Sequence, residues 1–318
     1  MRTTLEGIFF DESTNVGVRE TIPEALIPGF ELATHLGDGA TLIVFATLLY
    51  WFGAESSREK RALVIAIGLG ALAISAGMKG IFQHPRPVEH LAFAPAGYGG
   101  YSFPSAHALG AAAFYGAMAA VAETGTRRQR YAVAGVVIGV VALSRVVIGV
   151  HYLGDVVVGV ALGLLFVWAV LRSGDTEPTA VFALSGLIAI GAYALGSREF
   201  TTLTIGAALG ATAAWYVVRG ESYRPYGASI LVLALLTLPA IVALRLVSGH
   251  VGGYWPLEVA GYAAATAAVL VVPAVAERLN GWPQVAWLQR RLPFSGRTVD
   301  VEAFSSGVTE TKRGREGD

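Results

Sequence analysis

The stretch from Ser144 to Asp155 places an Arg, a His and an Asp between two apolar runs. His151 and Asp155 are four residues apart, so on a helix they would share one face. A carboxylate there can hold one imidazole nitrogen as N–H and leave the other free to attack or to bind a metal. Arg145 would not share that face on an unbroken helix, which predicts a helix break near Gly149. Because ionisable side chains in apolar surroundings are costly, we interpret the trio as functional. The alternative is a structural ion pair between Arg145 and Asp155.

A second cluster, Lys79-Gly-Ile-Phe-Gln-His-Pro-Arg86-Pro, closes an earlier apolar run. Lys79 and Arg86 are about two helical turns apart and could point the same way. The prolines at 85 and 87 disfavour a continuing helix and place Arg86 in an extended turn. Two fixed cations suit an anionic head group, because an Arg can bind two phosphate oxygens at once. The alternative is that both side chains only reach to the membrane interface.

A third cluster, Phe103-Pro-Ser105-Ala106-His107, opens the next apolar run. Proline is favoured near a helix start. The unpaired backbone N–H groups at such an end attract an anion, and the Ser105 hydroxyl adds a donor. His107 lies close enough to act as a general acid. The alternative is that Ser105 only caps the helix and His107 is an interfacial side chain.

Composition indicates the setting of these clusters. The chain has 318 residues, of which 54% are hydrophobic and only 14% charged. Its mean hydropathy is +0.57, whereas globular proteins carry about 25% charged residues. The sequence therefore predicts an all-α, polytopic transmembrane helical bundle. Apolar runs near the roughly 20 residues of a membrane helix lie at 35–53, 62–82, 104–122, 131–149, 152–171, 179–196, 201–218, 228–247 and 257–276.

Other classes of function are disfavoured. The formal net charge is zero, so no nucleic-acid partner is suggested. The chain has no cysteine, which excludes disulfides, Cys-ligated zinc and thiol catalysis. The 39 glycines suit close approach of helices within a bilayer.

The runs divide the chain into four parts. Residues 1–34 read as a polar arm with one short interfacial helix, 35–174 as the catalytic core, 175–278 as four additional spans, and 279–318 as a partly disordered cytoplasmic tail. No secretory signal peptide is visible. Lys and Arg gather in the loops after the first, third, fifth, seventh and ninth spans, which predicts that those loops are cytoplasmic. The N-terminus and the three clusters would then lie on the extracytoplasmic side.

This topology brings the clusters together. The second and fourth spans end on the outer side, where the third and fifth begin, so seven polar residues converge: Lys79, Arg86, Ser105, His107, Arg145, His151 and Asp155. The set fits phosphoryl transfer without metal, because cations and helix N-terminal amides can neutralise a phosphate. A His oriented by Asp can take the phosphoryl group, and a second His can protonate the leaving oxygen. A metal site would need more carboxylates or His, for which this side offers only Asp155 and the pair Glu89 and His90. We expect no metal and no cofactor.

The pattern Lys-x6-Arg-Pro, Pro-Ser-x-His and Ser-Arg-x5-His-x3-Asp closely resembles the type 2 phosphatidic acid phosphatase (PAP2) family over residues 35–171. The resemblance implies a six-helix core, to which the arm before Gly37 would supply a helix in the interface. It implies a phosphatase with His151 as nucleophile, Asp155 as its orienting group and His107 as general acid. It also implies that the phosphate ligands are Lys79, Arg86, Ser105, Ala106 and Arg145. Ala106 departs from the Gly of many members but keeps its backbone N–H, so phosphate binding should survive.

The implied function is an outward-facing membrane phosphatase of lipid phosphates or pyrophosphates, such as polyprenyl pyrophosphate, phosphatidate or phosphatidylglycerol phosphate. One alternative is a transferase that passes the phosphoryl or head group to another acceptor. Another is a phospholipid transporter, although binding alone would need cations and neither a nucleophile nor an acid. Vanadium haloperoxidases share similar motifs but are typically soluble. The partners expected are the bilayer and a lipid phosphate. Homo-oligomerisation and the role of the last four spans stay open.

Overall fold

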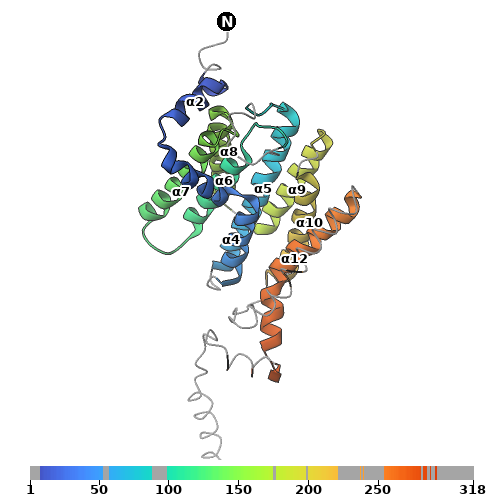
Figure 1. Ribbon diagram of the computed structural model, residues 1–318. Coiled ribbons are helices and arrows are strands. Elements are labelled where there is room, and N and C mark those ends of the chain that lie inside the picture. Colours follow the sequence, from blue (N-terminus) through green and yellow to red (C-terminus); the bar gives the residue numbers. More distant parts are fainter. Residues whose placement is uncertain are drawn as a thin grey trace, which may run out of the picture.

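The computed structural model describes residues 8–52, 57–87, 99–174, 177–197, 200–220 and 254–280, together with single positions beyond these ranges. All regular elements in these residues are helices, which confirms the predicted all-α class. The helices are α2 (Glu12–Glu20), α3 (Ile27–Thr34), α4 (Gly39–Phe52), α5 (Arg58–Phe82), α6 (Ala106–Val121), α7 (Arg127–Val147), α8 (Leu153–Arg172), α9 (Pro178–Ala194), α10 (Thr201–Val218) and α12 (Trp255–Asn280), with 3-10 turns η1 (Glu24–Leu26) and η2 (His35–Gly37) (Figure 1).

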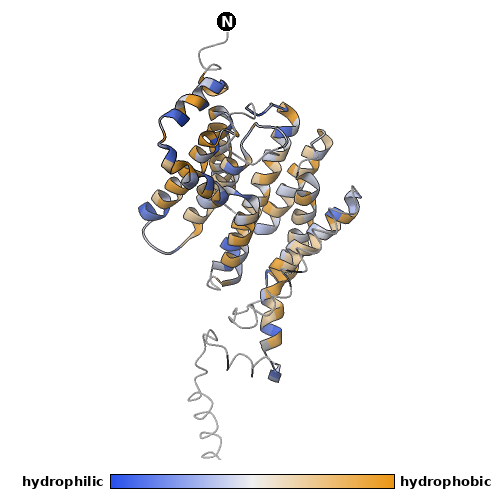
Figure 2. Ribbon diagram, in the orientation of Figure 1, coloured by the Kyte–Doolittle hydropathy of each residue, from blue (hydrophilic) through white to orange (hydrophobic). Residues whose placement is uncertain are grey.

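Five helices, α5, α7, α8, α10 and α12, are long and apolar enough to cross a membrane. The protein is therefore an integral membrane protein. Helices α6 and α9 are apolar but have only 16 and 17 residues. Helix α4 meets the length only together with the segment 24–37, from which it is bent by 56°. Each predicted span overlaps one of these helices except that at 228–247, which lies outside the described residues. Figure 2 shows hydrophobic residues along the long helices and hydrophilic ones on α2.

The N-terminal arm is more structured than its polar sequence predicted. Where the sequence predicted one short helix, about residues 23–36, the chain forms η1, α3 and η2. Helix α2 was not predicted, and it packs against α7. Asp11 caps it, because its Oδ1 accepts the backbone N–H of Ser13 at 2.9 Å. Phe10, just before the helix, lies with its ring centroid 5.4 Å from that of His84 and 6.3 Å from that of Tyr152. These aromatic contacts pack the arm against His84 and Tyr152, which lie within two of the predicted motif stretches.

Helix α6 packs against α5, α7 and α8, and its contact with α8 is close. Gly159 and Gly163 of α8 make this approach feasible. A Cβ at position 159 would lie 2.9 Å from the carbonyl oxygen of Ser105, and one at position 163 would lie 2.5 Å from that of Leu109. Small residues let two helix backbones approach in this way within a bilayer. The contact holds the start of α6 beside the start of α8, where two of the motifs lie.

Gly163→Ala should therefore destabilise the protein, because its methyl group would collide with the α6 backbone. We expect a loss of about 1–3 kcal/mol, as is typical of overpacking, seen as a lower thermal unfolding temperature in detergent. Gly135→Ala on α7 is the matched control, since nothing lies within 4 Å of a Cβ there. Equal unfolding temperatures for both variants would contradict this account of the α6–α8 contact.

Helices α9, α10 and α12 lie on the side of α5 away from α7 (Figure 1). Pro273 inside α12 has no N–H, so the carbonyl of Val269 lacks its helical donor. That carbonyl accepts Nε1–H of Trp51 in α4 at 2.8 Å, and the next one, of Leu270, accepts the Tyr50 hydroxyl at 3.2 Å. A proline in one helix thus provides the acceptor that joins α12 to α4.

Candidate active site

The predicted break near Gly149 is present. Helix α7 ends at Val147, and Gly149 has φ of 75°, a left-handed conformation that favours glycine. Helix α8 begins at Leu153, and Asp155 caps it by accepting the backbone N–H of Tyr152 on Oδ2 at 2.9 Å. Arg145 therefore belongs to the last turn of α7, whereas His151 lies in the connection between the two helices.

His151 and Asp155 are both buried, with 2% and 0% of their side chains exposed. The distance from His151 Nδ1 to Asp155 Oδ2 is 3.3 Å. Ser102 completes the group, since its Oγ lies 3.2 Å from His151 Nδ1 and donates to Asp155 Oδ2. Nδ1 thus faces two oxygen atoms that can accept a hydrogen bond from it.

Arg86 approaches the other side of the His151 ring. Its Nη1 lies 3.2 Å from His151 Nε2 and donates to the carbonyl of Val150 at 3.0 Å. A guanidinium can only donate, so Nε2 must be the acceptor nitrogen. The proton of the neutral ring is then on Nδ1, facing Asp155 and Ser102; this tautomer is assigned from the hydrogen-bond partners.

The electrostatic surroundings favour the neutral ring. Burial lowers the pKa of His151 well below its usual value, and the positive charges of Arg86, Arg145 and Lys79 lower it further. At neutral pH the imidazole therefore keeps a free lone pair on Nε2, the form that can attack an electrophile.

Lys79 and Arg145 lie at helix ends near His151. Lys79 is in the last turn of α5, Arg145 is in the last turn of α7, and both are buried. Arg145 Nη1 donates to the hydroxyl of Thr34 in α3 at 2.6 Å. Both cations act electrostatically on His151 and on His107. The three cations predicted from two motifs therefore all act on one imidazole, Arg86 by direct contact and Lys79 and Arg145 electrostatically.

Ser105, Ala106 and His107 form the start of α6, as predicted. Ser105 is the N-cap, and its Oγ accepts the N–H of Ala108 at 3.5 Å. Its own N–H donates to the carbonyl of Asp155 at 3.0 Å, which ties this helix start to α8. Ser105 thus caps α6, and Ala106 opens the helix and presents one of its first-turn N–H groups. His107 Nε2 lies 2.5 Å from Asp38 Oδ1.

Comparison with known proteins identifies this region. Residues 59–178 match the model of the PAP2 superfamily. This region of the chain belongs to the PAP2 superfamily. The match spans α5 to the start of α9 and contains all three motifs. It supports a membrane phosphatase at the level of the family.

Two solved structures resemble the chain. One is the crystal structure of a transmembrane PAP2-type phosphatidylglycerolphosphate phosphatase from Bacillus subtilis, with 24% identity, 55% of this chain and 88% of that chain covered, and a TM-score of 0.46. The other is LpxE of Aquifex aeolicus, with 21% identity, 51% and 94% covered, and a TM-score of 0.41. A search of curated proteins found no match.

Four residues at the PAP2 site were missed by the sequence analysis: Asn15, Thr34, Asp38 and Ser102. Ser102 stands three residues before Ser105, and its polar side chain beside the motif was the available signal. Asp38 is the one Asp, Glu, Lys or Arg within the predicted apolar run 35–53, which was a weaker signal. Asn15, whose Nδ2 donates to the carbonyl of His151 at 2.8 Å, had none.

The described residues of the PAP2 region contain no group of three or more His, Cys, Asp or Glu that could hold a metal ion. Glu89 and His90, the other carboxylate and imidazole considered from the sequence, lie outside the described residues.

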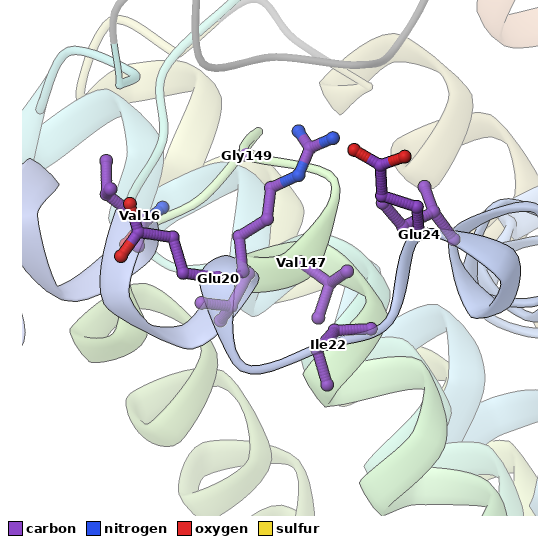
Figure 3. A pocket seen from close by; sticks show the side chains of 10 residues that line it. Val16, Glu20, Ile22, Glu24, Val147 and Gly149 are labelled. Atoms are coloured by element: carbon purple, nitrogen blue, oxygen red, sulfur yellow. The ribbon is translucent and has the colours of Figure 1, made fainter.

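A cavity of about 300 Å³ adjoins the connection that carries His151. Figure 3 shows Glu20 and Glu24 of the arm at opposite sides of the view, with Val147 and Gly149 between them. A larger cavity of about 970 Å³ lies between α7 and α8 and is lined mainly by apolar side chains. It runs from Val146 and Leu153, next to the PAP2 motifs, to Tyr131 and Arg172 at the opposite helix ends.

Proposed function

We propose that the protein hydrolyses lipid phosphates or pyrophosphates without a metal ion, through a phosphohistidine on His151. The observation that carries this proposal is the set of contacts around His151, from which its tautomer is assigned. Nδ1 holds the proton toward Asp155, and Nε2 keeps its lone pair on the side of Arg86, where an anionic phosphate would be bound. A nucleophile oriented by a second group in this way is the expected arrangement for covalent catalysis.

The other motif residues take complementary roles. The phosphate would lie against Lys79, Arg86 and Arg145, with the Ser105 hydroxyl and the first N–H groups of α6, including that of Ala106, as further donors. Three positive charges at this point neutralise the phosphoryl oxygens, the part that metal ions play in many phosphotransferases.

The reaction then proceeds in two steps. Nε2 of His151 attacks phosphorus while His107 gives a proton to the leaving oxygen, which releases the alcohol or phosphate product. His107 next accepts a proton from water, which attacks the phosphohistidine and releases inorganic phosphate. Asp155 holds the Nδ1–H throughout and balances the positive charge of the substituted ring.

A lipid substrate is supported by the apolar cavity between α7 and α8. One end of the cavity is lined by Val146 and Leu153, the sequence neighbours of the site residues, and its volume and apolar lining suit a hydrocarbon chain.

The arginines at the opposite helix ends support an extracytoplasmic position of the site. The start of α5 meets the end of α10, where Arg58 Nη2 donates to the carbonyls of Val218 and Arg219 at 3.0 and 2.9 Å. This Arg-rich end lies opposite the site and fits the cytoplasmic side.

The purified protein should release phosphate from phosphatidate or polyprenyl pyrophosphate at an undiminished rate in excess EDTA, and vanadate should inhibit it. Inorganic phosphate is measured as initial rates, with water-soluble glycerol phosphate as the comparison for a lipid preference. Intact cells should also hydrolyse short-chain phosphatidate added outside, compared with cells carrying His151→Ala. Loss of activity in EDTA that Mg²⁺ restores would contradict the metal-free mechanism, and latency until cells are permeabilised would contradict the outward site.

A further inference from the structure

His107 is joined to a carboxylate that none of the three motifs contains. Its Nε2 lies 2.5 Å from Oδ1 of Asp38, at the corner between η2 and α4. The second carboxylate oxygen, Oδ2, lies 2.6 Å from Nδ1 of His35. The exposed fraction falls along this chain, from 65% for His35 to 31% for Asp38 and 18% for His107. Both oxygens of Asp38 are thus engaged by imidazoles.

We propose that Asp38 is a positioning residue for the general acid His107, an inference that rests on the proposed function. With Nε2 directed at the carboxylate, Nδ1 is the ring nitrogen left to give a proton to the leaving oxygen. The negative charge also favours the protonated ring, which is the form that a general acid needs.

Packing fixes the corner that carries Asp38. Gly37 lies directly against α6 and α7, since a Cβ there would be 2.6 Å from Val141 Cγ1 and 3.2 Å from His107 Cβ. The Tyr115 hydroxyl of α6 donates to the carbonyl of Leu36 at 2.9 Å. Three residues before the corner, Thr34 receives the hydrogen bond of Arg145. The arm is therefore held against α6 and α7, two of the helices that bring motif residues to the site, so the Asp38–His107 contact is part of a packed interface.

The charges around His107 show why a carboxylate is useful there. Burial opposes protonation of its ring, and the positive charges of Arg145 and Lys79 oppose it further. These cations are needed to bind phosphate but would deprive the acid of its proton. Asp38, with His35 on its far side, supplies the opposing negative charge. Its removal should weaken proton binding by His107 and move the alkaline limb of the pH profile of kcat/KM to lower pH.

The test compares Asp38→Asn with Glu31→Gln, which removes an exposed carboxylate from the same arm. Residue 38 directly precedes α4, and Asn suits the position before a helix as well as Asp does, so α4 should keep its start. The comparison uses kcat/KM, which reports only the steps up to formation of the phosphohistidine, because the later hydrolysis is common to both substrates. For short-chain phosphatidate, whose alkoxide leaves poorly, Asp38→Asn should lower kcat/KM on the order of 10- to 100-fold. For p-nitrophenyl phosphate, whose phenolate leaves readily, the loss should be less than about threefold. Glu31→Gln should match the wild type with both substrates.

Two further measurements distinguish positioning from a structural role. In the His107→Gln background, Asp38→Asn should cause no further loss, because a residue that acts only through His107 is not additive with its removal. In protein labelled with ¹⁵N-histidine, the His107 signal, assigned by its absence from His107→Gln, should titrate at lower pH in Asp38→Asn. Asp38→Ser, another good cap, replaces Asp38→Asn if the latter does not fold.

The inference is overturned by equal losses with both substrates, by additive losses, by an unchanged His107 titration, or by a gain of activity, which would mean that Asp38 restrains His107. A wild-type protein that releases no phosphate would instead refute the proposed function. The histidine titration would still decide the link between Asp38 and His107 in that case, because it needs no turnover.

Discussion

His151→Ala should lower phosphate release by about 10⁴-fold or more, the loss expected when a covalent nucleophile is removed. Arg86, whose Nη1 lies 3.2 Å from Nε2, cannot replace it, because a guanidinium has no lone pair with which to accept a phosphoryl group. The variant should still fold. Asn15 donates to the backbone carbonyl of His151, and Asp155 keeps its bonds to Ser102 and to the N–H of Tyr152.

A direct measurement is the trapping of the intermediate. Wild-type protein mixed with ³²P-labelled phosphatidate and quenched within milliseconds should carry label that is stable in alkali and lost in acid, as expected of a phosphoramidate. His151→Ala should carry none. His84→Ala is the matched control, since it removes an imidazole that packs on Phe10 and Tyr152 near the site. Label on His151→Ala at the wild-type level would show that another residue is the nucleophile.

The features that the sequence could predict are those that depend on helix periodicity and on alternating sides of the membrane. The break at Gly149 followed from the spacing of Arg145 and His151. His151 and Asp155 meet as expected, but the shared helix face expected for them is wrong, because His151 lies in the connection before α8 and only Asp155 lies in the helix. To predict that the motif residues of the second to fifth spans meet at one end, it was enough to assume that each span crosses the membrane once. These relations are local or topological, so no knowledge of packing was needed.

The missed residues depend on how distant segments pack. Asn15 and His151 are 136 residues apart, Thr34 and Arg145 are 111 apart, and Asp38 and His107 are 69 apart. Each contact arises because α2, α3 and η2 fold back onto α6 and α7. The arm's polar composition indicated a solvated segment, yet Asn15, Thr34 and Asp38 form hydrogen bonds with residues of the buried site. A polar residue in such an arm therefore carries no sequence signal that separates a surface role from a second layer around the site.

The two serines show the limit of motif reasoning at closer range. The motif directs attention to Ser105, whose Oγ accepts the Ala108 N–H at the helix start. Ser102, outside the motif, is the hydroxyl that contacts both His151 and Asp155. The choice between them depends on the path of the chain into α6, which the spacing of residues along one helix does not specify.

Asp155→Asn should lower kcat by about 10³- to 10⁴-fold with little change in KM, because a comparable carboxylate-to-amide change in a serine protease triad costs about 10⁴-fold. The Asn carbonyl can keep the bonds that Oδ2 accepts from Ser102 and Tyr152. Its NH₂ group would then occupy the position of Oδ1, which is buried and has no hydrogen-bond partner among the described residues. A flipped amide would instead place NH₂ against the N–H of Tyr152 and against Nδ1 of His151. In either orientation no negative charge balances the ring when Nε2 binds the phosphoryl group.

Ser102→Ala separates the charge from the hydrogen bonds around it. It removes one donor to Asp155 but leaves the carboxylate, so it should lower kcat only about 10-fold, the equivalent of one hydrogen bond. Both variants are measured at saturating phosphatidate, with the burst of labelled phosphoenzyme recorded in parallel. Asp155→Asn should slow the burst itself, because the carboxylate assists attack by His151 before any water is needed. A normal burst followed by slow release would place Asp155 in the hydrolysis of the phosphohistidine alone, and near wild-type turnover would remove it from the mechanism.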